Sequence, residues 1–513
     1  MKRIFTTIIA LVAVSLGIQA VRPNISLKVY DTRKQTVTGF GGACCDGAMC
    51  PLGNDTKSVK LLYGPESEIG LNILRMEISP NFEGDVKVPE WGNWDTPYDW
   101  NGSLPSAKIV KQRGGIVFGT PWSPPGEYKT NGTAQGGNAE DQGYKEGRLR
   151  KDCYSKFFPW LNTFLEWMRK KGVNVDAVSV QNEPDWWVSY SGCLYEPAEQ
   201  VDLVKNFAYM LDREANPGVR LISAEPLGYR KDYFDALLAD ETCTEQVDIF
   251  AGHIYGHMPL QYIKPVAQKA LPLGKEVWMT EHSTTDNTGA LPTWTDNLIF
   301  AEELNECMLA GCTGYIYWYL RAHWSFCGTG ESQYGADNKK NELLPRAFVM
   351  SHFSKHVTGS TRLETSKDAD AGRTKEEILQ NSQFSAYIKG DSLIVIAINA
   401  MEKDQVMKIT LPYNVKSGEL WLSTGNEKEN LCQKSDLDIE ASTNEMITTL
   451  PAQSLSTYIF TIDQGSTAIE NVKSETVDGP ATYYDLQGRL LNEPHGLCIE
   501  RSANGSTRKV MMR

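Results

Sequence analysis

Two glutamates that each follow a short apolar segment carry the chemistry that this sequence most directly suggests. Glu183 ends the run Val-Ser-Val-Gln-Asn-Glu at 178–183, and Glu281 ends the run Val-Trp-Met-Thr-Glu at 277–281. Two such carboxyl groups can hydrolyse a glycosidic bond, because one gives a proton to the leaving oxygen while the other stabilises the charge that develops on the sugar. The alternative is a pair of rim carboxylates in salt bridges, which the apolar runs before both residues disfavour.

Other polar and aromatic side chains stand near the ends of further apolar segments. They are Arg75, Trp122, Asn182, His253, Tyr255 and Trp318. Each of them alone has an ordinary structural reading, as a packed aromatic or a buried ion-pair partner. Their joint occurrence at strand ends is harder to dismiss, since barrel enzymes build their active sites there. We expect Asn182 to bind a sugar hydroxyl, and Arg75 and Tyr255 to lie near an ionised Glu281.

The elements that must position these residues alternate between strand and helix. Eight short apolar segments read as strands, at 36–41, 71–78, 115–122, 176–181, 220–225, 248–255, 276–281 and 314–319. Helical stretches include 153–171, 197–215, 295–310 and 345–357. Eight strands, each followed by a crossover, predict an α/β fold of the (β/α)8 TIM-barrel type.

A doubly wound open sheet is the alternative to the barrel. Its usual signature is a glycine-rich phosphate turn with the spacing Gly-x-Gly-x-x-Gly after the first strand. The sequence Gly-Phe-Gly-Gly at 39–42 only imitates that spacing. We interpret this segment as a tight turn that enters the barrel.

The pattern changes to alternation with period two after about residue 359. Segments at 384–388 and 393–398, joined by Lys-Gly-Asp, predict a hairpin, and 455–460 predicts a closing strand. The chain therefore divides into a signal peptide at 1–20, an N-terminal strand of the β-domain at 21–35, a catalytic barrel at 36–359 and an attached side β-sandwich at 360–463. A polar linker at 464–479 and a C-terminal tail at 480–513 follow.

The composition limits the classes of partner that the chain is expected to bind. The 513 residues include 51 Lys and Arg against 64 Asp and Glu, a formal net charge of −13, with no long basic run. This disfavours nucleic acid and anionic membranes as partners. A neutral polysaccharide is compatible with this charge.

The first twenty residues predict a secretory signal peptide. Lys2 and Arg3 precede an apolar segment over 4–18 that is short for a membrane span, and Ala20 supplies a small residue at the cut. A retained anchor is the alternative. No other segment is apolar enough to cross a membrane, so the mature chain is expected to be secreted, periplasmic or bound at the cell surface.

The eleven cysteines leave at least one thiol unpaired, because the total is odd. Cys44, Cys45 and Cys50 lack the spacing of a zinc site. Buried thiols or one local disulfide are the favoured interpretation, and the pairing is left open.

At this point the sequence resembles a known family, glycoside hydrolase family 30. Segments 179–185 and 278–281 resemble the strands that carry its acid/base and its nucleophile. The likeness continues in chain order through 39–42, 73–75, 121–125, 253–256, 317–321, 350–355 and 450–454. It covers about residues 25–463, and within the family it is strongest to the xylanases of subfamily 8.

The resemblance implies a barrel with a tightly attached β-domain and a reaction that retains anomeric configuration. It implies Glu183 as acid/base and Glu281 as nucleophile. Around the sugar at the cleavage point it implies Asn182, Arg75, Trp122, Tyr255 and Trp318. The two-glutamate mechanism needs no metal or cofactor.

The sequence departs from the family in two places. Glucuronoxylanases of this group carry two consecutive arginines after the eighth strand, the second of which grips the glucuronate carboxylate. Here the pair is Arg321-Ala322, and the loop at 323–341 is longer. Residues 480–513 lie outside the family and resemble C-terminal tails of secreted or surface proteins from Bacteroidetes.

These features together predict a secreted retaining endo-β-1,4-xylanase without a strict glucuronate requirement, acting on a xylan-type polysaccharide. One alternative is another retaining β-glycosidase of the family, such as a β-1,6-glucanase or a glucosylceramidase-like enzyme. The other is a non-catalytic glycan-binding protein on an inactive barrel, which the presence of both glutamates disfavours.

Overall fold

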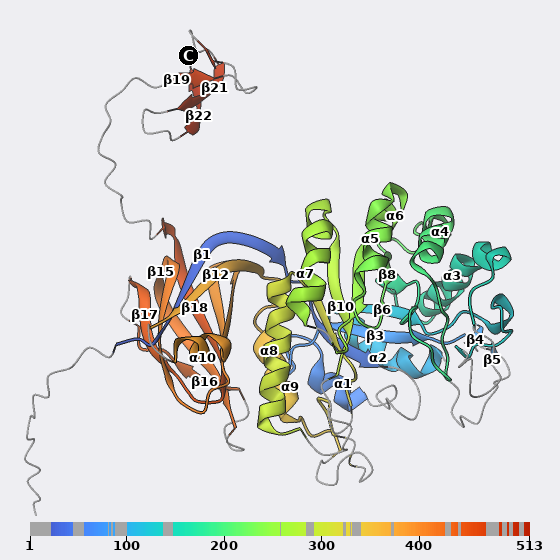
Figure 1. The fold of residues 1–513 in the computed structure, drawn as a ribbon, viewed down its shortest axis with the longest axis horizontal. Coiled ribbons are helices and arrows are strands. Elements are labelled where there is room, and N and C mark those ends of the chain that lie inside the picture. The colour runs from blue at the N-terminus through green and yellow to red at the C-terminus, as the bar shows by residue number, and fades with distance from the viewer. Residues whose placement is uncertain are drawn as a thin grey trace, which may run out of the picture.

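The computed structural model shows a closed parallel barrel with a separate sheet domain beside it (Figure 1). The structure describes residues 22–44, 56–80, 82–83, 86–87, 100–136, 147–256, 258–283, 292–321, 325–328, 330, 340–370, 374–425, 432–439, 443–467, 482–484, 490–491, 496–501 and 507–512. The predicted signal peptide, most of the predicted linker, Ala322 and most of the loop that follows it lie outside these residues.

The barrel closes through eight parallel strands, which confirms the predicted fold class. Around the barrel the order is β10-β11-β2-β3-β6-β7-β8-β9. The strands are β2 (Gly39–Cys44), β3 (Ile73–Ile78), β6 (Ile116–Pro121), β7 (Ala177–Ser179), β8 (Arg220–Ala224), β9 (Ile249–His253), β10 (Glu276–Glu281) and β11 (Gly314–Tyr317). Almost every position in them is buried, because a parallel barrel is covered on its outer face by helices and filled by side chains within.

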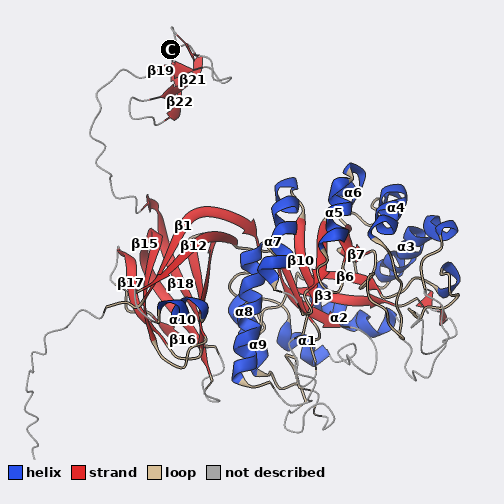
Figure 2. Cartoon of the chain, viewed as in Figure 1, coloured by secondary structure: helices blue, strands red, loops and turns tan. Residues whose placement is uncertain are grey.

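Helices form the outer layer of the barrel (Figure 2). They are α1 (Thr56–Leu62), α2 (Trp100–Gln112), α3 (Tyr154–Lys170), α4 (Pro197–Phe207), α5 (Lys231–Ala239), α6 (Glu241–Gln246), α7 (Pro259–Ala270), α8 (Trp294–Ala310) and α9 (Pro345–Ser354), with 3-10 turns η1 (Gly126–Tyr128), η2 (Lys151–Cys153), η3 (Ala208–Met210) and η4 (Leu271–Leu273). The helix predicted over 197–215 therefore ends earlier. α8 has clear boundaries: Thr293 and Asp296 form a capping box, and Gly311 ends the helix with a φ of 109°.

The prediction of a tight turn at 39–42 is wrong, because these residues form the barrel strand β2. Its glycines are needed because neighbouring atoms leave no room for a side chain. A Cβ at Gly41 would come within 1.7 Å of the Ile73 carbonyl oxygen, and one at Gly42 within 2.2 Å of the Leu320 side chain. Only glycine lets the neighbouring backbone and side chains approach this closely.

The second domain is a β-sheet that curls back on itself. Its strand order is β1-β12-β13-β14-β18-β15-β16, with β17 on β15, and β1 also pairs with β15. The elements are β1 (Ile25–Thr36), β12 (Thr361–Ala369), α10 (Lys375–Gln380), β13 (Ser382–Lys389), β14 (Ser392–Asn399), β15 (Gln405–Thr424), β16 (Gln433–Asp436), β17 (Thr443–Leu450) and β18 (Ser454–Thr467). β18 thus continues four residues past the predicted domain end. An apolar core of its own lies between the strands.

A buried histidine helps to attach this domain to the barrel. His352 of α9 bonds with Thr457 of β18 at 2.7 Å and with Ser423 of β15 at 3.0 Å. Complete burial, with a smaller effect from His356, lowers the pKa of His352 to about 3, so its ring is neutral and serves as one donor and one acceptor. The segment 350–355, which resembles the glycosidase family, therefore joins the two domains.

Smaller features complete the described chain. β4 (Phe82–Glu83) pairs with β5 (Val86–Lys87), and β19 (Thr482–Tyr484), β20 (Leu490–Leu491), β21 (Gly496–Arg501) and β22 (Thr507–Met512) form a four-stranded sheet. Among the described residues, nine cysteines are buried free thiols. Nowhere in the described ranges is a helix long and apolar enough to span a bilayer.

Candidate active site

The seven predicted site residues come from six barrel strands and meet at one end of the barrel. Arg75 lies within β3, and Glu281 is the last residue of β10. The others lie one to four residues beyond the ends of their strands: Trp122 after β6, Asn182 and Glu183 after β7, Tyr255 after β9 and Trp318 after β11. Parallel strands bring their carboxyl ends to one rim, which is where barrel enzymes carry out their chemistry.

Arg75 is the central cation of this site, and its side chain is fully buried. One guanidinium nitrogen bonds to Glu281 Oε2, and the other donates to Asn182 Oδ1 at 2.7 Å. The guanidinium carbon lies 4.7 Å from the centre of the Trp122 ring, within the range of a cation–π contact. The single guanidinium therefore orients three of the predicted residues.

Glu281 is held by two donors, one on each oxygen. Arg75 contacts Oε2, and the Tyr255 hydroxyl donates to Oε1 at 3.0 Å. Burial, together with the Glu281 charge, raises the pKa of the Tyr255 hydroxyl well above its usual range, so the phenol keeps its proton. The guanidinium and the neutral phenol therefore fix the direction of both carboxylate oxygens.

The surroundings of Glu183 favour the protonated form of its carboxyl group. Its Oε1 is 2.9 Å from His253 Nδ1. Burial raises the pKa of Glu183; the hydrogen bond with His253 opposes this, the nearby Glu281 charge adds to it, and the net direction is upward. Two neighbouring carboxyl groups with unlike environments are the arrangement that separates an acid from a nucleophile.

Glu225, which the sequence analysis did not single out as a site residue, is the third buried glutamate here. It follows β8, and its Oε1 lies 3.5 Å from Arg75 Nη2 and 3.8 Å from His253 Nε2, while Oε2 accepts from Thr120 at 3.1 Å. Burial opposes its charge, but Arg75 and His253 outweigh that and lower the pKa to about 2. A signal for it was present: Glu225-Pro226 after β8 repeats Glu183-Pro184 after β7.

The charges of this buried cluster balance in one protonation state. Burial lowers the pKa of His253, but Glu281, Glu183 and Glu225 raise it to about 9 overall, so the imidazole is a cation at neutral pH. Two cations, Arg75 and His253, then face the anions Glu225 and Glu281. The cluster is neutral when Glu183 carries a proton, which agrees with the raised pKa of that residue.

The backbone at both glutamates after β7 and β8 is unusual. Glu183 has a φ of 45° and Glu225 a φ of 54°, in the left-handed region that non-glycine residues seldom occupy. The Glu183 amide donates to the Glu225 carbonyl at 3.0 Å, so the two turns support each other. Strained positions of this kind concentrate at functional sites.

Two tryptophans form an aromatic wall beside the carboxylates. The ring centres of Trp122 and Trp318 are 5.9 Å apart, and Trp318 is only partly buried. The Gln181 amide fixes the backbone on this side by donating to the carbonyls of Trp122 at 2.5 Å and Asn182 at 2.9 Å. Flat apolar faces next to hydrogen-bonding groups suit a sugar ring, which presents both kinds of surface.

A metal ion does not suit this donor set. One atom each of Glu183, His253 and Glu281 lie within 4.8 Å of one another, close enough in principle to share a cation. A metal there would have to displace the proton of His253, whose pKa the neighbouring glutamates raise to about 9. It would also lie near the buried guanidinium of Arg75, which bonds to Glu281 and repels a cation.

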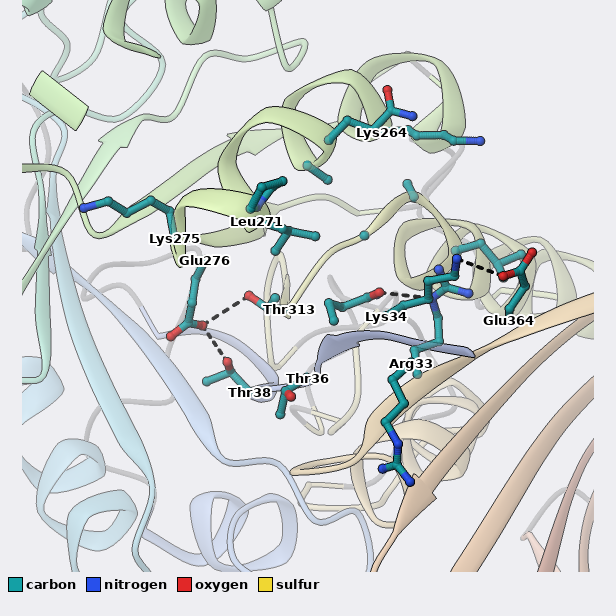
Figure 3. A pocket seen from close by; sticks show the side chains of 18 of the residues that line it. Arg33, Lys34, Thr36, Thr38, Lys264, Leu271, Lys275, Glu276, Thr313 and Glu364 are labelled. Atoms are coloured by element: carbon teal, nitrogen blue, oxygen red, sulfur yellow. Dashed lines mark hydrogen bonds and ion pairs between the residues drawn. The ribbon is translucent and has the colours of Figure 1, made fainter. Parts of the chain in front are cut away.

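A separate cavity of about 1020 Å³ lies at the other end of the barrel strands (Figure 3). It is bordered by β1, α7 and the start of β10, where Glu276 accepts from Thr38 at 2.5 Å and from Thr313 at 3.1 Å. Its other carboxylate, Glu364, pairs with Lys34 at 3.0 Å. Both carboxylates are engaged in structural contacts, so this cavity does not reproduce the arrangement at the rim.

Comparison with known proteins points to one group of enzymes. No family model matches the chain. It is 26% identical over 459 residues to a protein named glucuronoxylanase XynC from Bacillus subtilis, covering 88% of this chain and 96% of that one. An endo-1,6-beta-D-glucanase from Neurospora crassa is 32% identical, but over only 35% of this chain and 41% of its own length.

A solved structure extends this likeness to three dimensions. The glycoside hydrolase family 30 subfamily 8 xylanase Xyn30A from Clostridium acetobutylicum superposes with a TM-score of 0.68 at 29% identity, covering 85% of this chain and 99% of that one. The barrel, the paired glutamates at its rim and these relatives lead to one conclusion. This chain is a glycoside hydrolase that resembles the family 30 xylanases.

Proposed function

We propose that the chain is a secreted, retaining endo-β-1,4-xylanase that cleaves xylan with Glu183 as acid/base and Glu281 as nucleophile. The observation that carries the proposal is the closeness of the two carboxyl groups, since one oxygen of each lies within 4.8 Å of the other. Retaining enzymes hold their carboxyl groups roughly 5–5.5 Å apart, and inverting enzymes roughly 6.5–9.5 Å because a water must fit between. The observed closeness supports a double displacement.

In the first step Glu281 attacks the anomeric carbon while Glu183 protonates the oxygen of the departing sugar. Arg75 and Tyr255 contact its two oxygens and fix their direction. Glu183 has the raised pKa that an acid needs at moderate pH. The bond between sugar and leaving oxygen breaks, and Glu281 becomes an ester of the glycosyl unit.

In the second step Glu183 becomes a base, because the first step itself lowers its pKa. The Glu281 charge is one of the causes that raise the pKa of Glu183. Esterification removes that charge, so the pKa of Glu183 falls, and the lost proton has already left with the sugar. His253, protonated and 2.9 Å away, then stabilises the Glu183 carboxylate while it takes a proton from the attacking water. The water oxygen bonds to the anomeric carbon as the ester bond to Glu281 breaks, which restores the Glu281 carboxylate and the proton on Glu183.

Xylan is the proposed substrate because of the extent of the likeness. The protein named glucuronoxylanase matches along 88% of this chain, whereas the endo-1,6-beta-D-glucanase matches along 35%. Cleavage without a need for glucuronate is proposed from Ala322, which replaces the second arginine of the family pair. Arg321 is 5% exposed, so its buried guanidinium is poorly placed to take over that role.

The test is a digest of four polymers by the purified chain: glucuronoxylan, xylan stripped of uronic acid, β-1,6-glucan and β-1,4-glucan. Both xylans should be cut internally, and proton NMR should show first-formed ends in the β configuration. Glu281→Gln supplies the inactive background. First-formed ends in the α configuration would overturn the retaining mechanism, and cutting of β-1,6-glucan alone would favour the glucanase alternative. Binding of xylan without any turnover would favour the glycan-binding alternative.

A further inference from the structure

Three large aromatic side chains stand exposed directly after Glu183. Trp186 is 51% exposed, Trp187 47% and Tyr190 45%. They occupy the loop between β7 and α4, and no other tryptophan in the described part of the chain is as exposed. Exposed aromatic rings offer flat apolar area, and three of them within five residues of one loop beside Glu183 provide such area next to the site.

The loop that carries them is firmly anchored, although its aromatic side chains are not covered. Val188, between the two tryptophans and Tyr190, is 7% exposed. It fits against two glycines: a Cβ at Gly192 would come within 2.5 Å of Val188 Cγ2, and one at Gly136 within 2.7 Å of the Val188 carbonyl oxygen. The Gly136 amide also donates to the Tyr190 carbonyl at 2.8 Å.

A buried lysine strengthens this anchor. The ammonium group of Lys129, which is 2% exposed, donates to the carbonyls of Ala134 at 3.1 Å, Gln135 at 2.7 Å and Gly192 at 2.5 Å. It thereby ties the segment after β6 to the loop after β7. A surface held in place before binding loses less conformational entropy when a ligand arrives.

The same loop is joined to the reacting centre. The Trp186 amide donates to the Glu183 carbonyl at 3.1 Å, and the Leu227 amide donates to Asp185 Oδ1 at 2.9 Å. In the proposed reaction Glu183 gives its proton to the sugar that leaves. The part of the polymer that departs must therefore lie on the Glu183 side, next to this loop.

We infer that Trp186, Trp187 and Tyr190 form a platform on which the sugar units of the leaving portion of the polymer stack. This inference rests on the proposed function, because it takes Glu183 as the acid. The occupant is a chain of β-linked pyranoses, whose flat C–H faces match aromatic rings. The platform gives the enzyme a reason to prefer internal bonds, since only they leave sugar units on both sides of the cut.

The experiment compares two substrates with each variant, Trp186→Ala, Trp187→Ala and Tyr190→Ala. On xylan stripped of uronic acid, each tryptophan variant should lose about tenfold in kcat/KM, which corresponds to about 1.4 kcal/mol. On β-xylobiosyl fluoride, whose leaving group is one atom, kcat/KM should stay unchanged. Trp186→Phe should recover most of the loss, and Tyr209→Ala, on η3 and 71% exposed, is the matched aromatic control.

A second readout separates stacking from a structural defect. Added xylo-oligosaccharide competes with water for the glycosyl-enzyme, and its transfer product should decrease in the tryptophan variants while hydrolysis of the fluoride persists. Unchanged activity on xylan, or equal losses on xylan and fluoride, would overturn the platform alone. Failure of the unmodified chain on both substrates would overturn the proposed function and the platform with it.

Discussion

Replacing Glu225 by Gln should make the free energy of unfolding of this protein depend less on pH in the acidic range. The carboxylate is fully buried against Arg75 and His253, and its pKa is lowered from 4.5 to about 2. The difference between 4.5 and about 2 corresponds to about 3 kcal/mol of unfolding free energy. Because the pKa in the folded state is the lower one, this stabilisation is present above pH 4.5 and is lost as the pH falls towards 2.

Urea unfolding followed by circular dichroism at several pH values measures this directly. Near pH 6 the Glu225→Gln protein should be less stable than the unmodified protein by about 3 kcal/mol, and near pH 3 by only about 1 kcal/mol. Glu364→Gln is the control. Its exposed pair with Lys34 should contribute less than about 1 kcal/mol at either pH. A stability difference for Glu225→Gln that is the same at both pH values would refute the charge account of this cluster.

Three further predictions concern activity. The rate on xylan should fall on the alkaline side as Glu183 loses its proton, with a midpoint above pH 4.5 because burial and the Glu281 charge raise its pKa; a pH–rate profile without an alkaline limb would contradict this. Arg75→Lys should lower kcat by roughly ten- to a hundredfold, since an ammonium group can replace only one of the two charge-assisted bonds, and the lost one is worth about 1.5–3 kcal/mol. Unchanged steady-state kinetics would remove Arg75 from the mechanism. Values of kcat/KM on glucuronoxylan and on stripped xylan should agree within about threefold. An arginine that binds the glucuronate carboxylate would instead separate them by about ten- to a hundredfold. Products that all carry glucuronate at one fixed position would contradict the prediction.

Much of the barrel and the core of its site could be predicted because both depend on local patterns. Each apolar strand followed by a polar or aromatic residue is visible in the sequence, and a closed barrel brings those ends together. Glu183 and Glu281 are found this way, and Arg75 is found as a charged residue inside a mostly apolar strand. The glycines of β2 were wrongly predicted to form a turn. They are needed because Ile73 and Leu320, which are distant in sequence, approach them closely in the fold.

Other features depend on tertiary structure and left weaker signals. Glu225 matters because Arg75 and His253 converge on it from other strands, although the repeated Glu-Pro pair after neighbouring strands was a usable signal. Lys129 reads as an ordinary surface lysine, and only the folding of two loops against each other buries its ammonium group. Sequence periodicity carries no information about such long-range contacts.

Trapping the covalent intermediate would identify the nucleophile directly. The protein is incubated with 2-deoxy-2-fluoro-β-xylobiosyl fluoride and digested with a protease, and the masses of its peptides are measured by mass spectrometry. We expect one 2-deoxy-2-fluoroxylobiosyl adduct, on Glu281, formed also by Glu183→Gln because fluoride leaves without needing a proton. An adduct on Glu183, or inactivation of neither protein while xylan is still cleaved, would contradict the assignment of nucleophile and acid.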